Sequence, residues 1–265
     1  MKLSVVTTTY NRPAALNLVI QGFTQQKNIE TSEWELIIAD DGSGIETKNL
    51  IDDWKRKSSI SIKHIWHEDK GFRAAKIRNL ASQTSAAEYL VFIDGDCIPM
   101  NDFCIQHLRL AEPGWMVAGT RILASEKFTK ELLNNTLPLP YQWSPLDWFT
   151  HRLKNNINSS LGWLRTNPNT LRHITPKNWK RLRGCNFGIH KKDFEKTGCF
   201  NEEFEGWGYE DSEFAIRGIS RGIHIKDGRL IAPLLHLWHS ENDRSLEKYN
   251  KSKLEALIKK NEKYL

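Results

Sequence analysis

The sequence lacks a long hydrophobic run, a paired-cysteine motif and an internal repeat. No 18 consecutive apolar residues occur among its 265 residues, which excludes a membrane-spanning helix. The amino terminus, MKLSVVTTTYNR, has too short an apolar stretch for a signal peptide and no small-residue cleavage site after it. Four cysteines without a CxxC pair then predict reduced thiols rather than a disulfide framework or a zinc site. We therefore expect a cytoplasmic protein.

Positive charge is concentrated in one segment. The net charge is +6, but residues 121–183 carry 11 Lys or Arg against 3 Asp or Glu. Four tryptophans lie in the same segment, at positions 143, 148, 163 and 179. Apolar residues there recur every three or four positions and predict one stripe of a helix, formed by Phe149, Leu153, Ile157, Leu161 and Leu164.

Three interpretations of this basic, tryptophan-rich segment stay open. It is a folded insertion that shapes an acceptor pocket, an element that contacts an anionic membrane surface, or a nucleic-acid-binding segment. The first two are compatible with each other and are favoured, so we expect no nucleic acid among the partners.

The first 120 residues alternate between short aliphatic runs and segments of helical spacing. The runs predict strands at residues 3–8, 34–39, 60–66, 89–93 and 116–119. Helices are predicted between them at residues 13–26, 47–57 and 73–82, and later at 211–221 and 246–265. Buried strands joined by helices form a mostly parallel sheet with helices on both faces. Ligands of such sheets bind beyond the carboxyl ends of the strands, where the polar loops TTTYNR, ADDGSG and DGDCIP lie.

The stretch LVFIDGDCIP places two carboxylates, Asp94 and Asp96, at the end of a buried strand. Buried carboxylates are costly unless a positive group meets them. An Asp-x-Asp pair at a strand end suits a hard divalent cation that also binds phosphate oxygens, although Asp-Gly is also a common turn. The strand that precedes this pair favours the metal site.

TTTYNRP and DDGS together resemble the nucleotide-binding half of the GT-A glycosyltransferases, specifically the large inverting family-two type, over residues 3 to about 120. The resemblance implies an α/β, Rossmann-like fold and a UDP-sugar donor. It places Thr8 and Tyr10 in the base pocket, and Asp41 as the acceptor of the uracil N3–H. Arg12 would also bind the donor, and Asp94 would hold ribose or donor-sugar hydroxyls. Taken on their own, residues 40–43 favour a turn or a helix N-cap over a nucleotide site.

GFRAAKIRNLA adds basic residues at the start of the helix that precedes the DGD strand. Helix amino termini and arginines both favour phosphate. In the resembled family a basic residue here faces the nucleotide sugar, and Arg78 is preferred over Arg73 and Lys76. A solvated helix face is the alternative.

The later segments RGCNFGIHK and EEFEGWGYEDSEFAIR are similar to chondroitin polymerases and to galactosyltransferases with a GWG-x-E-D motif. That resemblance implies that Trp207 and Glu210 contact the acceptor sugar and that Asp211 is the general base. Acidic residues at this place also cap a helix, and both roles are compatible. The two framing glycines predict a sharply bent or mobile loop.

LLHLWHS supplies two histidines three positions apart, a pattern that is more often structural than metal-binding. In the galactosyltransferase relatives the position of His239 is a metal ligand, and His236 is the less certain second one. With Asp96 these residues would hold Mn²⁺, or Mg²⁺ in its place.

The resemblance implies a metal-dependent inverting transferase that moves a hexose or N-acetylhexosamine from a UDP-sugar to a glycan hydroxyl. Surface polysaccharide or lipopolysaccharide synthesis is the expected setting, at the inner face of a membrane. A single domain is expected, with a nucleotide-binding half (1–120), an insertion (121–183), a catalytic half (184–245) and a carboxyl-terminal helix (246–265). A sugar-nucleotide nucleotidyltransferase is disfavoured because TTTYNRP contains no glycine. A non-catalytic glycan-binding protein is disfavoured because the acidic and histidine residues are all present.

Overall fold

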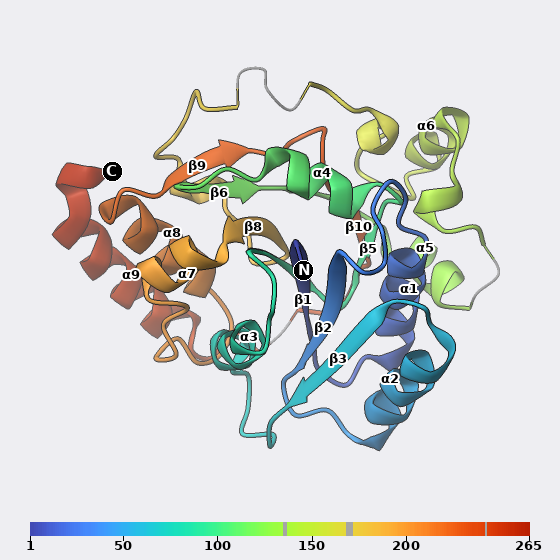
Figure 1. The fold of residues 1–265 in the computed structure, drawn as a ribbon, viewed down its shortest axis with the longest axis horizontal. Coiled ribbons are helices and arrows are strands. Elements are labelled where there is room, and N and C mark those ends of the chain that lie inside the picture. The colour runs from blue at the N-terminus through green and yellow to red at the C-terminus, as the bar shows by residue number, and fades with distance from the viewer. Residues whose placement is uncertain (135–136, 168–171, 242) are drawn as a thin grey trace.

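A computed structural model describes residues 1–134, 137–167, 172–241 and 243–265. Its centre is a seven-stranded mixed sheet in the order β3-β2-β1-β4-β8-β6-β9, with helices on both faces (Figure 1). Within the described ranges, no helix combines the length and the apolarity needed to cross a bilayer.

Four parallel strands form one half of the sheet: β1 (Leu3–Thr9), β2 (Trp34–Asp40), β3 (Ser61–Trp66) and β4 (Tyr89–Asp94). Helices connect them: α1 (Pro13–Thr24), α2 (Ile45–Lys57) and α3 (Ala74–Gln83). Successive β1 residues enter opposite cores, since Val5 packs with α1 and Val6 with α3. Burial on both faces explains the continuous apolar runs, and the predicted mostly parallel α/β sheet is confirmed.

The other half of the sheet contains an antiparallel strand. This strand, β8 (Asn186–His190), runs antiparallel to both β4 and β6 (Trp115–Ala118), and β6 pairs in parallel with β9 (His224–Asp227). Helices α7 (Lys191–Thr197) and α8 (Glu210–Ser220) contribute to the same core as α3. The chain thereby returns to the middle of the sheet, as β8, immediately before α7.

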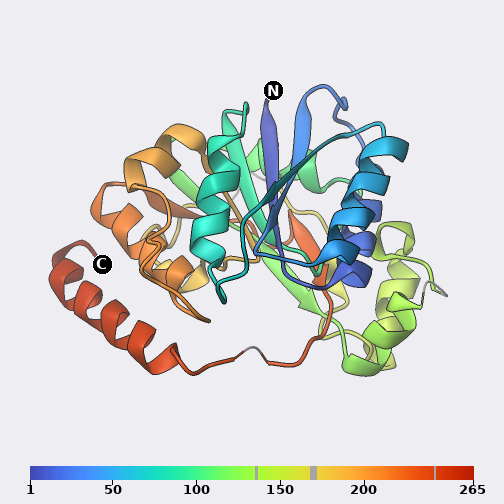
Figure 2. The same ribbon diagram turned by 90° about the horizontal axis from the view of Figure 1, so that it is seen from below.

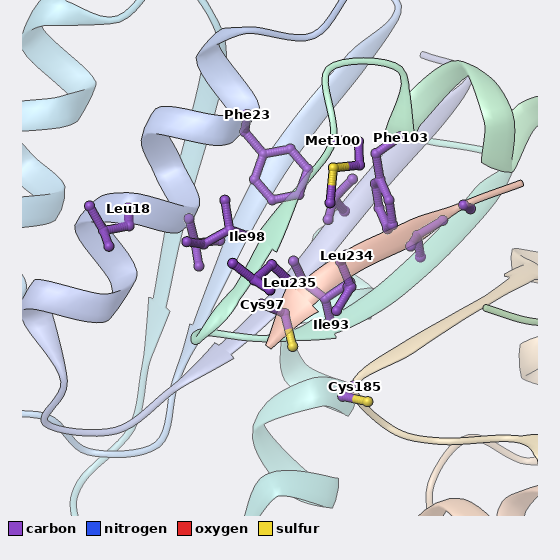
Figure 3. Packing of buried hydrophobic residues seen from close by; sticks show 14 of the residues in the cluster. Leu18, Phe23, Ile93, Cys97, Ile98, Met100, Phe103, Cys185, Leu234 and Leu235 are labelled. Carbon is purple, nitrogen blue, oxygen red and sulfur yellow. The ribbon is translucent and has the colours of Figure 1, made fainter. Parts of the chain in front are cut away.

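A second sheet of three short strands lies beside the first. It contains β5 (Cys97–Pro99), β10 (Pro233–His236) and β7 (Thr120–Leu123) in the order β5-β10-β7. Leu235 and Ile98 of this sheet pack with Phe23 of α1 and with Phe103 of α4 (Phe103–Leu110) in one core (Figure 3). This sheet brings the residue after Asp96 next to His236, because Cys97 pairs with His236.

The predicted single helical stripe in the basic segment is wrong. Helix α5 (Glu126–Leu133) is followed by the short turn η1 (Pro140–Gln142), and α6 (Pro145–Leu153) ends before Asn155, which has a left-handed backbone with φ of 55°. Ile157 is buried because it bridges Ala124. Leu161 belongs to a separate turn, η2 (Leu161–Trp163). The apolar residues therefore keep a helical spacing in the sequence, although the helix ends at Leu153 and the later residues belong to other elements.

The chain ends in α9 (Glu247–Asn261), which packs against α8 and is reached by a long connection from β10 (Figure 2). A short turn, η3 (Trp179–Arg181), precedes β8, and another, η4 (Glu262–Tyr264), follows α9. The four cysteines are free thiols.

Candidate functional site

A cavity of about 730 Å³ opens at the carboxyl ends of β1, β2 and β4. All twelve side chains that the sequence singled out lie on its wall: Thr8, Tyr10, Arg12, Asp41, Arg78, Asp94, Asp96, Trp207, Glu210, Asp211, His236 and His239. They come from segments up to about 230 positions apart, so the fold assembles the predicted set at one place. The roles of the individual residues stay predictions.

The first two loops are fastened to each other by Asn11. Its backbone N–H donates to Ser43 Oγ over 2.8 Å, and its side-chain Oδ1 accepts from the Gly44 N–H over 2.9 Å. Asn11 adopts a left-handed backbone with φ of 47°, which asparagine tolerates better than most residues. This pair of contacts fixes the loop after β1 against the loop after β2.

Asp41 is buried in the cavity wall, which it shares with Tyr10. Its Oδ1 is 2.6 Å from His67 Nε2, and its Oδ2 accepts from the Arg73 backbone N–H over 2.8 Å. Burial raises the pKa of the Asp41 carboxyl, and these hydrogen bonds oppose part of that shift. Each oxygen retains a lone pair, so the carboxylate can accept a further donor. Tyr10 closes the rim, with its hydroxyl donating to Asp69 over 2.8 Å.

The glycine between the two strand-end aspartates has a packing reason. A Cβ on Gly95 would lie 2.8 Å from the Thr8 carbonyl oxygen, to which the Gly95 N–H donates over 2.7 Å. The DGD turn therefore lies tightly against the end of β1. As a result, Asp94 and Asp96 point to different partners.

Asp96 faces two histidines and an arginine. His236 Nε2 and His239 Nε2 each lie 3.6 Å from one of its oxygens, and Arg12 Nη1 lies 2.5 Å from Oδ2. The ligand atoms of Asp96, His236 and His239 lie within 4.8 Å of one another. One carboxylate and two imidazoles that converge in this way form a donor set that Mn²⁺ accepts, and the residues fit the predicted metal.

Asp94 and Glu210 are joined by one buried arginine. Arg78, only 3 % exposed, donates to Asp94 Oδ1 over 3.0 Å, to Glu210 Oε1 over 2.9 Å and to Thr8 Oγ1 over 3.0 Å. Burial raises the pKa of both carboxyls, and the Arg78 charge pulls both back down. The Arg78 guanidinium is therefore paired with one carboxylate of the DGD segment and one of the GWGYED segment, and it is not exposed to solvent.

The GWGYED loop is sharply bent, as the sequence predicts. Gly206, Gly208 and Tyr209 all have positive φ, and Tyr209 is a rare non-glycine N-cap in that region. Such strain is retained at functional sites. Asp211 faces the segment just before β8, where its Oδ2 accepts from the Gly184 N–H over 2.9 Å, and its Oδ1 accepts from the Ser212 N–H of α8 over 2.6 Å.

The Trp207 ring is covered on one side by Arg244. The guanidinium carbon lies 4.5 Å from the ring centroid, a cation–π geometry. Arg244 comes from the connection between β10 and α9, so this connection reaches a residue of the cavity wall.

Sequence reasoning did not assign a role to several further residues of this wall or its support. Arg121, Arg183 and Tyr209 line the cavity, and His67 stands behind Asp41. The two arginines lie at the borders of the basic segment, a signal that points to the cavity. His67 is a single histidine after a strand, and only the fold reveals its partner.

Comparisons with known proteins agree with this arrangement. A model of Glycosyl transferase family 2 matches residues 4–198, and a model described as the N-terminal domain of galactosyltransferase matches residues 170–240. Chondroitin synthase of Escherichia coli is 26 % identical over 235 residues, which cover 84 % of this chain and 33 % of that protein. Validoxylamine A glucosyltransferase of Streptomyces hygroscopicus subsp. jinggangensis is also 26 % identical, over 86 % of this chain and 53 % of that protein.

Solved structures show the same fold. TarS of Staphylococcus aureus superposes with a TM-score of 0.63 at 16 % identity, covering 97 % of this chain and 39 % of that one. A mannosyltransferase of Pyrobaculum calidifontis gives a TM-score of 0.59 at 14 % identity, covering 97 % and 62 %. This chain thus spans about a third of the first of these sequence relatives. With its GT-A fold and a family model that matches most of its length, the chain belongs to glycosyltransferase family 2.

Proposed function

We propose that this chain transfers a hexose or N-acetylhexosamine from a UDP-sugar to a glycan hydroxyl, with inversion at the anomeric carbon. One observation supports this most strongly: a single cavity holds the Asp96–His236–His239 donor set, the buried Asp41 and the carboxylate of Asp211. The donor set would bind a metal ion, Asp41 would bind the nucleobase of the donor, and Asp211 would act as the general base.

The donor would bind along the ends of the parallel strands. Asp41 accepts the N3–H of uracil, a contact that a cytosine N3 lone pair would oppose, and Thr8 and Tyr10 line the base pocket. Asp94, held in place by Arg78, accepts ribose or donor-sugar hydroxyls. Arg12 and the exposed Arg183 offer positive charge to the phosphates.

Asp96, His239 and His236 would hold Mn²⁺ or Mg²⁺ between the donor and the catalytic loop. When bound, the ion neutralises charge that develops on the departing diphosphate. Among the solved structures, the Pyrobaculum mannosyltransferase contains GDP-Man and Mn²⁺, and TarS contains UDP in one crystal and UDP-GlcNAc in another.

The acceptor would enter beside the GWGYED loop. Trp207 offers an aromatic face to a sugar ring, Glu210 accepts from an acceptor hydroxyl, and Asp211 removes the proton of the attacking hydroxyl. Gly184 and Ser212 hold the Asp211 carboxylate in one orientation through backbone N–H groups, which prepares it for that task. The names of the relatives, chondroitin and hyaluronan synthases among them, support a polysaccharide acceptor, and lipopolysaccharide is a further acceptor that we propose.

A thermal-shift screen of nucleotide sugars with and without Mn²⁺ tests the donor. Bound ligand raises the melting temperature through mass action, so UDP-sugars with Mn²⁺ should stabilise the protein more than GDP- or dTDP-sugars do. UDP release in the presence of a glycan acceptor then tests turnover. A protein that no nucleotide stabilises, with either metal present, would contradict the proposal.

A further inference from the structure

The exposed face of α6 carries an apolar stripe that nothing in the described chain covers. Leu146, Phe149 and Leu153 follow one another at spacings of three and four residues and are 71 %, 54 % and 67 % exposed. The turn η2, which packs on α6 through Gly162 and Trp148, carries two further exposed apolar residues, Leu161 and Trp163, which are 45 % and 47 % exposed. These five residues are called the α6 surface below.

The α6 surface is held rigidly from behind. Trp148, on the opposite side of the helix, is buried, and Trp143 contacts both its ring and that of His151. Gly162 lies flat on Trp148, since a Cβ there would approach the indole ring to 2.3 Å. The apolar stripe therefore cannot fold inward, because this aromatic core already fills the space beneath it.

The exposed charges at the carboxyl-terminal end of the stripe are positive. Arg152 and Lys154 are exposed at the end of α6. The acidic residue of the helix, Asp147, is engaged in a capping box with Ser144, whose backbone N–H and hydroxyl both donate to it. An apolar stripe with Trp at its edge and Lys and Arg beside it is typical of a helix that lies in the interface of an anionic bilayer.

The same segment is attached to the metal-site residues. The Ala124 N–H donates to the His236 carbonyl over 2.9 Å, and the Trp238 N–H donates to Thr129 Oγ1 over 2.9 Å. Trp238, between the two histidines, is itself 41 % exposed. A surface bound by this segment would thus be linked directly to the cavity edge.

We infer that the α6 surface docks this protein onto an anionic lipid bilayer. Leu146, Phe149 and Leu153 enter the acyl boundary, while Arg152 and Lys154 meet lipid phosphates. Docking would bring the cavity to glycans carried in the bilayer, and this purpose rests on the proposed function. The affinity for lipid does not depend on the proposed function.

Vesicle co-sedimentation of the full chain tests this inference. Wild type should bind phosphatidylglycerol–phosphatidylcholine vesicles at least about tenfold more tightly than pure phosphatidylcholine, because each Lys or Arg near such a surface contributes about a factor of five. The triple variant L146S/F149S/L153S should lose binding by about tenfold or more, since it removes the inserted apolar area. R152Q/K154Q should lose most of the preference for the anionic vesicles and the sensitivity to salt.

A matched control replaces three exposed apolar residues elsewhere. I45S/Y249S/Y264S should bind vesicles like wild type. Circular dichroism and melting temperature establish that every variant folds. Equal binding to both vesicle types, or none to either, would overturn the inference. So would a wild-type dimer that L146S/F149S/L153S turns into a monomer without any lipid binding, because the surface would then join two copies of the chain. UDP binding, measured in the same samples, separates this failure from that of the proposed function.

Discussion

Arg12 and Asp96 form an ion pair inside the cavity, with Arg12 Nη1 2.5 Å from Asp96 Oδ2. His239 Nε2 lies 3.6 Å from the same Oδ2, and His236 Nε2 lies 3.6 Å from Oδ1. A divalent cation bound by Asp96 would repel the guanidinium, so Arg12 and the metal compete for one carboxylate. Donor phosphates, in contrast, would attract both.

Replacing Arg12 therefore should have opposite effects on two ligands. In Arg12→Gln we expect Mn²⁺ to bind the free protein roughly threefold or more tightly, because a partly exposed competing ion pair has been removed. UDP in the presence of Mn²⁺ should bind more weakly, because a phosphate partner is lost. Titration calorimetry of each ligand measures both effects. If Mn²⁺ affinity also falls, Arg12 supports the metal site instead of competing for it.

Substitution of each aspartate of the DGD turn should weaken the binding of a different ligand. Asp96→Asn should weaken Mn²⁺ binding by about tenfold or more, since a neutral amide is a poorer ligand than a carboxylate. Asp94→Asn should leave metal affinity close to wild type and weaken donor binding, because Asp94 pairs with Arg78 and lies outside the donor set. Metal titrations and donor titrations on both variants provide the comparison. Equal loss of metal affinity in the two would contradict this division of roles.

Asp211→Asn tests the base. We expect kcat to fall roughly 10²–10⁴-fold, the usual contribution of a positioned general base. UDP affinity should stay unchanged, because Asp211 contacts Gly184 and Ser212 rather than the donor end of the cavity. UDP release in steady state and UDP binding by calorimetry measure the two quantities. Normal turnover in this variant would show that another group takes the proton.

The buried carboxylate of Asp41 should make nucleotide binding weaker at low pH. Burial raises the pKa of its carboxyl, so its charge is lost at a higher pH than in an ordinary aspartate. UDP affinity should therefore fall as the pH drops through that raised pKa, because a protonated Asp41 is a poorer acceptor for the uracil N3–H. The neighbour His67 faces the same carboxylate and is present in every variant.

UDP affinity measured as a function of pH in Asp41→Asn and Asp69→Asn separates this effect from a general loss of structure at low pH. Asp41→Asn should bind UDP weakly at all pH values and lose the acid limb. Asp69 is exposed, and its hydrogen bond from Tyr10 lowers the pKa of its carboxyl, so Asp69→Asn should keep the limb. An unchanged limb in Asp41→Asn would assign it to another group.

The sequence predicted the parallel half of the sheet well because its strands are buried on both faces. Runs such as 34–39 and 89–93 are mostly apolar and short, and their length favours a buried strand over a buried helix. The three-stranded sheet escaped prediction, since β5, β7 and β10 have three or four residues each and carry no measurable period. The antiparallel position of β8 also depends on long-range pairing that no local pattern encodes.

The same contrast holds for the site. Residues directly after strands, such as Asp41 and Asp96, could be placed together because parallel strands end at one edge. Arg78 was predicted as a cavity residue, but its burial among Asp94, Glu210 and Thr8 became visible only when α3, β4 and α8 were packed together. Spacing misled in the basic segment, where Ile157 is buried by a bridge to Ala124 rather than by a helix face.

Arg78→Met tests whether the buried ion cluster stabilises the fold. The substitution keeps much of the side-chain volume but leaves Asp94 and Glu210 without their common cation. Removal of one partner from a buried pair typically costs about 3–5 kcal/mol in the free energy of unfolding. Urea unfolding of the full chain at neutral pH measures this loss, and Arg56→Met, which removes an exposed pair with Asp53, should change the midpoint little.

The pH dependence of that loss identifies its cause. Burial already raises the pKa of Asp94 and Glu210, and Arg78 opposes this shift, so both pKa values should rise further in Arg78→Met. A carboxyl with a raised pKa in the folded state destabilises the protein above that pKa and ceases to do so once it is protonated in both states. The deficit of Arg78→Met relative to wild type should therefore shrink as the pH is lowered from 8 toward about 5. A deficit that stays constant over this range would assign the loss to packing of the arginine side chain rather than to its charge.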